Sequence, residues 1–518
     1  APEGFVLNGK SQQVELKYKD QNTSIVFDDT SFVNERQKVD LNVVKKDADT
    51  DVPLSGALFG LYAKEDIKNA DGKVVGKADE LVYQADSDEN GLAHFDADLP
   101  LAKYYIKELK APVGYASSDE VIDFDATYKG QEVETIELSS DFKNEITKVE
   151  VSKKDITNDE EIEGAHLKVY PKGKPGEVFD SWISGQDGKT EDGNIKPHLI
   201  KGLETGVTYV LEETSAPYGY ALTQEVEFTV DDTGKVQGVE MKDEMVFGQL
   251  KWKKTGEIFM QTITGQTEFG ETQSPVWETS NILGAEITIY AAEDITIGNH
   301  TYYHKGEAIQ TLESDWETVI SKKLPVGRYY YKETSTPHGY ITDTQRHYFE
   351  IKDNQINEIQ TVESELQNDR PTVNINMKKV LEEQEVFKNT EAYKDIVFGI
   401  YAREDIYNYK GEVAIENGQL IYTSGIDEDG HLALADTFDF PNGVYYIKEL
   451  ATNEQYILDE KEYDFEIAWH GGDVAEYTIN IGSEEGILNE LQRGKIYIHK
   501  TDMDTREAMA NVRFTLAT

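Results

Sequence analysis

A lysine, a glutamate and an asparagine or aspartate recur in the same order along the chain, and their side chains could form a covalent bond. In a dry core, desolvation lowers the pKa of a lysine and raises that of a glutamate, so that both groups become neutral. A neutral amine can attack a carboxamide or a protonated carboxyl group, while the glutamate passes protons to the leaving group. Burial supplies the high effective concentration that amide formation needs. The recurrence therefore predicts autocatalytic amide bonds between side chains.

The glutamates stand near the ends of strands with alternating aromatic or apolar residues, as in the stretch from Tyr104 to Glu108. A turn follows each strand, because proline is followed by glycine two residues later. This pattern occurs around Glu108, Glu213 and Glu333. A fourth copy around Glu449 keeps the strand but continues Asn-Glu-Gln-Tyr, with neither the proline nor the glycine. Four recurrences predict a repeated unit.

The lysines close the first strand of each unit. Alternation places Leu41, Val43 and Lys45 on one face of a strand, and the other units repeat this arrangement. Each candidate has a lysine beside it, and alternation selects the one in phase with the apolar residues. The neighbours set aside in this way are Lys46, Lys154, Lys253 and Lys378.

The spacing of these residues predicts tandem domains joined by short linkers. From each closing Asn or Asp to the next lysine the separations are 11, 9, 11, 11 and 11 residues. A period above about 100 residues favours separate domains in a stiff, extended and monomeric rod over a solenoid. The expected units are part of a domain at 1–39, full domains at 40–147, 148–247, 248–371 (with a loop insertion at about 255–281) and 372–493, and the start of a further domain at 494–518.

Composition narrows the function. The chain has 518 residues, no cysteine and a net charge of −48. The absence of cysteine excludes disulfides and thiolate metal sites, and the charge argues against nucleic acid or anionic membranes as partners. No apolar run is long enough to span a bilayer. The expectation is an all-β, acidic protein without a cofactor or metal, and no motif indicates an enzyme acting on a substrate.

At this point the sequence resembles a known family. The succession Val/Ile-x-Lys-x-Asp, Gly-Ala-x-Phe-x-Leu-Tyr, Tyr-x-x-x-Glu-Thr-x-Ala-Pro-x-Gly-Tyr and a closing Asn is similar to CnaB (SpaA-like, prealbumin-type) domains. These domains build the stalks of Gram-positive surface adhesins and pilins. The resemblance implies immunoglobulin-like β-sandwiches, many of which form an internal isopeptide bond from Lys to Asn or Asp, assisted by Glu.

Carried over residue by residue, the resemblance and the chemistry give four candidate sites and two unpaired residues. Three sites would lose ammonia, the Lys–Asp site would lose water, and Asn34 and Lys500 have no partner in the chain. The candidate sites are Lys45–Glu108–Asn144, Lys153–Glu213–Asp243, Lys254–Glu333–Asn368 and Lys379–Glu449–Asn489. The ordinary alternative is that each lysine extends its amine to solvent and each asparagine closes a turn.

Other motifs have structural explanations. The run from Asp86 to Gly91 copies the start of a calcium loop but lacks the acidic residue at position twelve, which favours a hairpin turn; Asp427–Gly430 is similar. His300 and His304 have the spacing of two metal ligands on one face of a helix. Their segment is strand-like, where that spacing does not bring the two side chains together. Lys172 follows a Val-Tyr-Pro run similar to the pilin motif that a sortase joins to the next subunit, but Pro171 also fits a strand end.

Together these features predict a mechanical stalk at the bacterial cell surface, outside the cell. The alternatives are a shaft subunit of a sortase-assembled pilus and a module that binds a host ligand. The expected partners are a host protein or glycan, or neighbouring surface-protein domains. Among the candidate binding surfaces, the insertion with Phe259, Phe269 and Trp277 is favoured because it carries aromatic residues.

Overall fold

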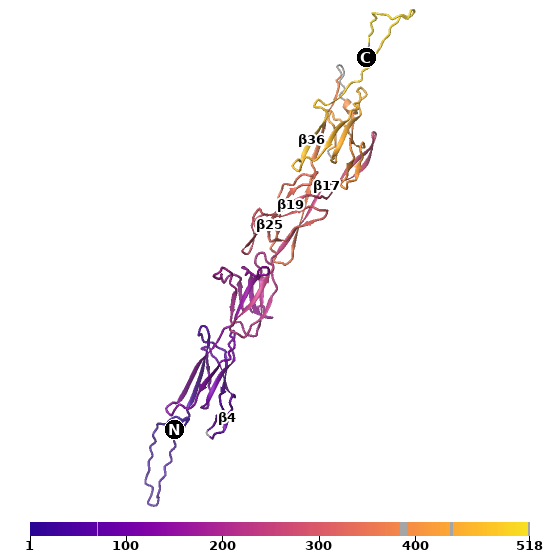
Figure 1. Cartoon of the computed structure of the whole chain (residues 1–518). Coiled ribbons are helices and arrows are strands. Elements are labelled where there is room, and N and C mark those ends of the chain that lie inside the picture. The colour runs from indigo at the N-terminus through magenta and orange to yellow at the C-terminus, as the bar shows by residue number, and fades with distance from the viewer. Residues whose placement is uncertain (70, 384–390, 436–438, 516–518) are drawn as a thin grey trace. The chain divides into compact units, whose positions relative to one another are not determined.

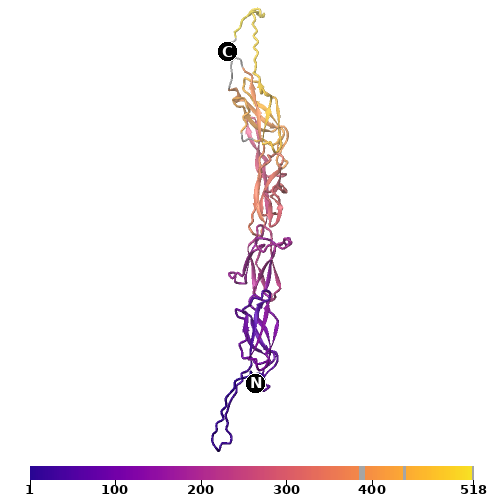
Figure 2. The same cartoon turned by 90° about the vertical axis from the view of Figure 1, so that its left-hand side faces the viewer.

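The computed structural model describes residues 1–69, 71–383, 391–435 and 439–515. Within these residues the regular structure is strand, apart from one 3-10 turn, η1 (Ala392–Asp395). Figures 1 and 2 show arrows joined by loops throughout. The predicted all-β class is confirmed. No helix in the described residues is long and apolar enough to cross a membrane.

The chain divides into two compact units. The first comprises residues 1–246, 297–300 and 353–358, and the second comprises residues 247–296, 301–352 and 359–518. Each contains two β-sandwiches, named here first to fourth in chain order. The domain boundaries expected from the sequence stay predictions.

The first sandwich packs a three-stranded sheet, β6-β1-β9, on a four-stranded sheet, β5-β2-β7-β8. Alternating residues of β1 and β2, such as Leu41 and Phe59, meet Tyr104 of β7 in one buried cluster. The strands are β1 (Lys38–Asp47), β2 (Leu58–Ala63), β5 (Leu81–Asp86), β6 (Leu92–His94), β7 (Lys103–Lys110), β8 (Val121–Asp125) and β9 (Thr135–Asn144), with a small hairpin β3 (Ile67–Lys68) and β4 (Val74–Gly76).

The second sandwich repeats this plan with sheets β13-β10-β16 and β12-β11-β14-β15. Its buried cluster joins Val151 of β10 to Leu211 of β14. The strands are β10 (Lys148–Asp155), β11 (His166–Pro171), β12 (Asp180–Ile183), β13 (His198–Lys201), β14 (Thr208–Ser215), β15 (Val226–Thr229) and β16 (Val236–Asp243).

The third sandwich pairs β17 with β23, β24 and β27, facing a sheet β22-β19-β25-β26. Trp252 of β17 and Tyr329 of β25 are fully buried. The strands are β17 (Phe247–Thr267), β18 (Gly270–Asn281), β19 (Glu286–Ala291), β20 (Ile295–Ile297), β21 (His300–Tyr303), β22 (Ala308–Glu313), β23 (Val319–Ile320), β24 (Leu324–Pro325), β25 (Gly327–Ser335), β26 (His347–Ile351) and β27 (Gln360–Asn368).

The fourth sandwich has a first strand divided into β28 and β29, which pair with β36 and β37, against the strands β33-β30-β34-β35. Its core cluster includes Met377, Phe398 and Tyr445. The strands are β28 (Thr372–Met377), β29 (Lys379–Leu381), β30 (Val397–Ala402), β31 (Ile406–Tyr407), β32 (Val413–Ile415), β33 (Leu420–Gly425), β34 (Gly443–Ala451), β35 (Tyr463–Ile467), β36 (Glu476–Ile481) and β37 (Ile487–Asn489).

The insertion at about 255–281 is not a loop, and that part of the sequence prediction is wrong. β17 continues past the third sandwich as one strand of 21 residues and turns back through β18. β18 then pairs in parallel with β33 at Thr272 and Leu420. The backbone groups of the insertion are paired by the antiparallel ladder between β17 and β18, so its residues extend as a ribbon. β17 belongs to the same compact unit as β36 of the fourth sandwich.

Candidate functional site: the buried lysine clusters

In all four sandwiches the first and last strands lie side by side and run parallel. This pairing brings the lysine strand next to the strand that ends in Asn or Asp. In each pair, the residue two positions after the lysine is directly opposite the Asn or Asp. The matched pairs are Asp47 with Asn144, Asp155 with Asp243, Gly256 with Asn368 and Leu381 with Asn489.

This register fixes the approach of the two side chains. Side chains two positions apart on a strand share a face, so each lysine and its partner are diagonal neighbours on the inner face of the sheet. The lysine Nζ donates a hydrogen bond to the Oδ1 atom of Asn144, Asp243 and Asn368 in the first three sandwiches. In the fourth, Lys379 Nζ lies 2.6 Å from Asn489 Oδ1. The amine nitrogen is thus held beside the carbonyl group of its partner.

The glutamates reach these pairs from the opposite sheet. They stand on β7, β14, β25 and β34, the strands that carry the aromatic alternation. The lysine Nζ lies 2.9 Å from Glu108, 2.9 Å from Glu213, 3.3 Å from Glu333 and 3.5 Å from Glu449. The structure therefore brings each predicted lysine, glutamate and Asn or Asp together.

Each glutamate also contacts the amide nitrogen in the three asparagine sites. The Nδ2 atom of Asn144 donates to both carboxylate oxygens of Glu108, at 2.9 and 2.8 Å. The corresponding distances from Asn368 to Glu333, and from Asn489 to Glu449, are 2.8 and 3.0 Å in both cases. A carboxyl group bonded to both the amine and the amide nitrogen is placed to carry a proton from one to the other.

A backbone contact that sequence reasoning missed holds each glutamate in place. The N–H group ten residues further along donates to the glutamate Oε2 atom in every copy, at 3.0, 2.9, 2.7 and 2.8 Å in chain order. The donors are Ser118, Thr223, Asp343 and Asp459. Since the donor is a main-chain group, no residue type marks the contact.

Burial removes all four clusters from water. The lysines are at most 1% exposed, and the glutamate side chains likewise. Desolvation by burial lowers the pKa of Lys45, Lys254 and Lys379, which favours the neutral amine. Burial also raises the pKa of Glu449, and that of Asp243 to about 7. A protonated Asp243 is the form whose carboxyl group can lose water.

The lysines set aside by alternation point outward. Lys46 pairs with Asp141 at 2.7 Å, Lys253 pairs with Glu365 at 3.5 Å, and Lys154 pairs with Glu240. Lys378 is exposed. Only the in-phase lysine of each pair reaches the core.

Two hairpin turns hold the lysine backbone from the other side. Gly91 has φ +74° and accepts a hydrogen bond from the Lys45 N–H at 2.7 Å, and a Cβ there would lie 2.4 Å from the Lys45 carbonyl oxygen. Gly430 has φ +90° and makes the same contact with Lys379 at 2.6 Å. Only glycine fits this conformation at such close approach. The acidic turns that resembled calcium loops therefore position the lysines. In the described part of the chain, no group of three or more His, Cys, Asp or Glu side chains could hold a metal ion.

Comparison with known proteins now gives the family. Residues 39–140, 147–245 and 277–365, more than half of the chain, match the SpaA prealbumin-like fold domain. The chain belongs to the SpaA family. The third match begins within β18, so most of the long hairpin lies outside the family pattern. No curated protein matches this chain.

Among solved structures, the chain is similar at low identity to bacterial proteins that include two major pilins. The Bacillus anthracis TIE protein is 23% identical, with a TM-score of 0.40 over 65% of this chain and 52% of that one. The chain thus spans about half the length of that protein. A variant of BcpA, the major pilin subunit of Bacillus cereus, is 15% identical with a TM-score of 0.32, covering 64% of this chain and 100% of that one. The Corynebacterium diphtheriae major pilin SpaD is 16% identical with a TM-score of 0.27, covering 64% and 98%.

The fourth sandwich keeps a turn that the sequence does not reveal. The tyrosine N–H bonds to the carbonyl of Pro112, Pro217 or Pro337 three residues earlier in the first three copies, and Tyr456 bonds to Asn453 in the same way at 2.9 Å. The turn tyrosines also reach the loop after the first strand. Tyr115 Oη donates to Asp47, Tyr220 Oη to Asp155, and Tyr456 Oη to the carbonyl of Glu382, at 3.0, 2.8 and 3.3 Å. Asn453 therefore replaces the proline without loss of the turn.

The remaining predicted site residues of the SpaA chain are not brought to partners. Asn34 is half-buried and Lys500 is exposed, and within the described residues neither meets a lysine or carboxamide of the kind found in the clusters. Residues 490–515 contain no strand, only single bridges such as that of Thr501 with Ala508. Lys172 is exposed and pairs with Glu227 at 2.6 Å.

Proposed function

We propose that the chain is a load-bearing stalk of a bacterial surface protein, cross-linked by autocatalytic isopeptide bonds in its four sandwiches. The observation that carries this proposal is the repeated cluster of a buried lysine, a glutamate and an Asn or Asp. Membership of the SpaA family agrees with it. The stalk would stand outside the cell, among other surface or pilus subunits.

The reaction needs no external reagent. At Lys45, the neutral Nζ attacks Cγ of Asn144, forming a C–N bond. Glu108 takes a proton from the nitrogen and delivers it to Nδ2, the Cγ–Nδ2 bond breaks, and ammonia leaves. At Lys153 the leaving group is water, because the acceptor is the carboxyl group of Asp243. The products are one amide bond and one small molecule per site.

The position of the bonds explains why they would strengthen a stalk. Tension enters each sandwich at the start of the first strand and leaves after the last strand. Because the parallel strands end together, a bond from Lys45 to Asn144 would carry the load along β1 and out past β9. The residues between them, a sequence separation of 99, would not be extended.

The bonds would also stabilise the fold. They would close loops with separations of 99, 90, 114 and 110 residues. By the loop-closure argument used for disulfides, each contributes roughly 4–5 kcal/mol. Unlike disulfides, amide bonds are indifferent to redox conditions.

The intact mass of the denatured chain tests the proposal. Each Lys–Asn bond removes about 17 Da and the Lys–Asp bond about 18 Da, so the full chain should be lighter than its sequence by about 69 Da. Lys→Ala changes at 45, 153, 254 and 379 should each restore one loss. A denatured mass equal to that of the sequence would exclude the bonds.

A further inference from the structure

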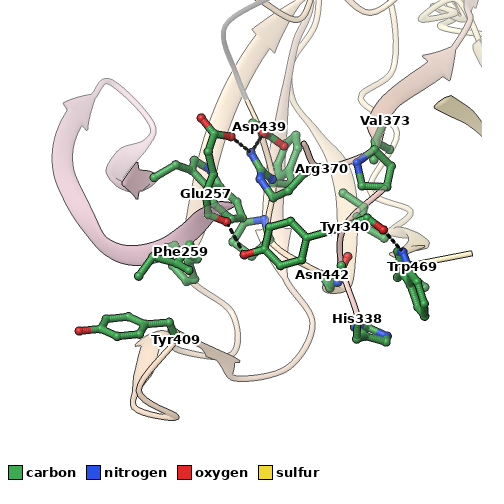
Figure 3. Close-up of a pocket in the computed structure, with 18 of the residues that line it drawn as sticks. Glu257, Phe259, His338, Tyr340, Arg370, Val373, Tyr409, Asp439, Asn442 and Trp469 are labelled. Carbon is green, nitrogen blue, oxygen red and sulfur yellow. Dashed lines mark hydrogen bonds and ion pairs between the residues drawn. The ribbon is translucent and has the colours of Figure 1, made fainter. Parts of the chain in front are cut away.

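A cavity of about 390 Å³ opens in the second unit, where the long hairpin meets the fourth sandwich. Its walls come from three parts of the chain: the hairpin, the turn at His338–Tyr340, and the segments around Arg370, Tyr409, Asp439 and Trp469. Figure 3 shows these labelled side chains around the space. The volume lies within the roughly 300–1,000 Å³ typical of small-molecule pockets.

The wall is held rigidly. Tyr340 Oη donates to the carbonyl of Glu257 at 2.8 Å, and Trp469 Nε1 donates to the carbonyl of Tyr340 at 3.0 Å (Figure 3). The Tyr409 N–H bonds to the carbonyl of Phe259 at 3.0 Å. The hairpin, the turn and the fourth sandwich are thus tied together around a preformed space.

The polar chemistry centres on Arg370. Its guanidinium lies 3.3 Å from the ring centroid of Trp277 and is bonded to Asp439 and, at 3.3 Å, to Glu257. Its Nε atom and the Trp277 Nε1 atom are buried, and neither has a hydrogen-bond acceptor within the described residues. These two atoms are closed off from the cavity, so the charged groups that a ligand can reach there are the partly exposed carboxylates of Asp439 and Glu257.

The aromatic lining supplies flat apolar surfaces. Tyr407 and Tyr409 are 57% and 37% exposed at the cavity, and Trp469 lies beside His338 with ring centroids 4.7 Å apart. Tyrosine and tryptophan provide an apolar face together with a polar group, which suits ligands that are apolar on one face and hydroxylated at the edge.

The charges restrict the ligand further. One arginine faces two carboxylates in the cavity, and the chain carries −48 overall, so anionic ligands are disfavoured. Both carboxylates are already bonded to Arg370, so neither is free to pair with a cationic ligand. What remains is a neutral molecule with many hydroxyl groups.

We infer that this cavity binds a neutral saccharide. Hydroxyl groups of the sugar would donate to Asp439 and Glu257, and the C–H face of the sugar ring would pack on Tyr409 or Trp469. The site goes beyond the stalk function and does not depend on the isopeptide bonds.

The test uses the full chain and four neutral disaccharides: lactose, N-acetyllactosamine, chitobiose and maltose. Calorimetric titration should show that at least one binds with a Kd below about 1 mM. Tyr409→Ala and Arg370→Lys should each weaken binding at least about tenfold, because the first removes the stacking surface and the second removes the guanidinium that holds Asp439 and Glu257 in place. Trp316→Ala, an aromatic residue 54% exposed and outside the cavity, serves as the matched control and should leave binding unchanged. Thermal unfolding of each variant shows that the fold is kept.

Three results would overturn the inference. One is no binding of any of the four sugars at about 10 mM. Another is tighter binding of sialyllactose than of lactose, which would indicate an anion site. The third is sugar binding that Tyr409→Ala and Arg370→Lys leave unchanged, which would place the saccharide elsewhere. If none of the four sugars binds but a proline-rich tetrapeptide does, the cavity is a peptide groove and the inference is also overturned.

Discussion

Lys45 and Asn144 meet although 99 positions separate them, because Asp47, two residues after Lys45, lies directly opposite Asn144 in a parallel strand pair. The same two-residue offset recurs in the other three sandwiches. A constant offset makes the geometry of the four clusters comparable, so a substitution in one can be judged against the others.

Glu333→Gln should prevent the bond between Lys254 and Asn368 while the other three form. A carboxamide keeps the size of the side chain but cannot accept and release the proton. The denatured mass should rise by about 17 Da beyond the change due to the substitution itself. Glu350→Gln, on an exposed position of β26, is the matched control and should show no such rise. Bond formation at the normal extent in Glu333→Gln would show that the glutamate is dispensable.

Gly91→Ala should destabilise the first sandwich by roughly 1–3 kcal/mol, because a Cβ would lie 2.4 Å from the Lys45 carbonyl oxygen at φ +74°. Gly72 provides a close control, with φ +75° and nothing within 4 Å of its Cβ position. Denaturant unfolding of both variants separates the crowding from the backbone strain. Equal losses in the two variants would contradict the role given to Gly91.

Lys379→Met should lower the stability of the fourth sandwich by roughly 4–5 kcal/mol through loss of the cross-link. Burial raises the pKa of Glu449, so the remaining carboxyl group can stay protonated without its amine. Calorimetry should show one transition moving to lower temperature. Lys378→Met, at the exposed neighbouring residue, should leave every transition temperature unchanged. Equal shifts in the two variants would contradict a buried cross-link at Lys379.

Glu213→Gln should make the second sandwich sensitive to pH. Without the bond, Asp243 keeps its carboxyl group, and burial, the largest cause of its shift, still raises its pKa above 3.8 when Glu213 is replaced. The folded state then binds this proton more tightly than the unfolded state, so the free energy of unfolding is highest below about pH 4 and decreases as the pH rises towards 7. The Tm of the variant should therefore be lower at pH 7.5 than at pH 5, relative to the unsubstituted chain.

In the unsubstituted chain the proposed bond would consume the carboxyl group, and this contribution would be absent. Identical pH dependence in the two proteins would mean either that Asp243 never reacts or that its pKa is ordinary, and the intact mass distinguishes the two.

The sequence was sufficient where local alternation decides the outcome. Lys45 was selected over Lys46 because a strand sends successive side chains to opposite faces. The sequence was insufficient where the structure of a segment depends on pairing with a distant strand. The polar residues of the hairpin resemble a loop, and nothing near Thr272 indicates that Leu420 will pair with it. The turn at Asn453 was also hidden, because its hydrogen bond uses only main-chain atoms.

The length of β17 has a consequence for the order of folding. A chain made from its N-terminus completes β18 well before β33, the strand that it pairs with, has been synthesised. Until then the hairpin presents an unpaired edge, which is open to pairing with another chain. The fourth sandwich therefore protects the open edge of the hairpin by pairing with β18. A nascent chain that stops before residue 420 would be prone to associate with copies of itself.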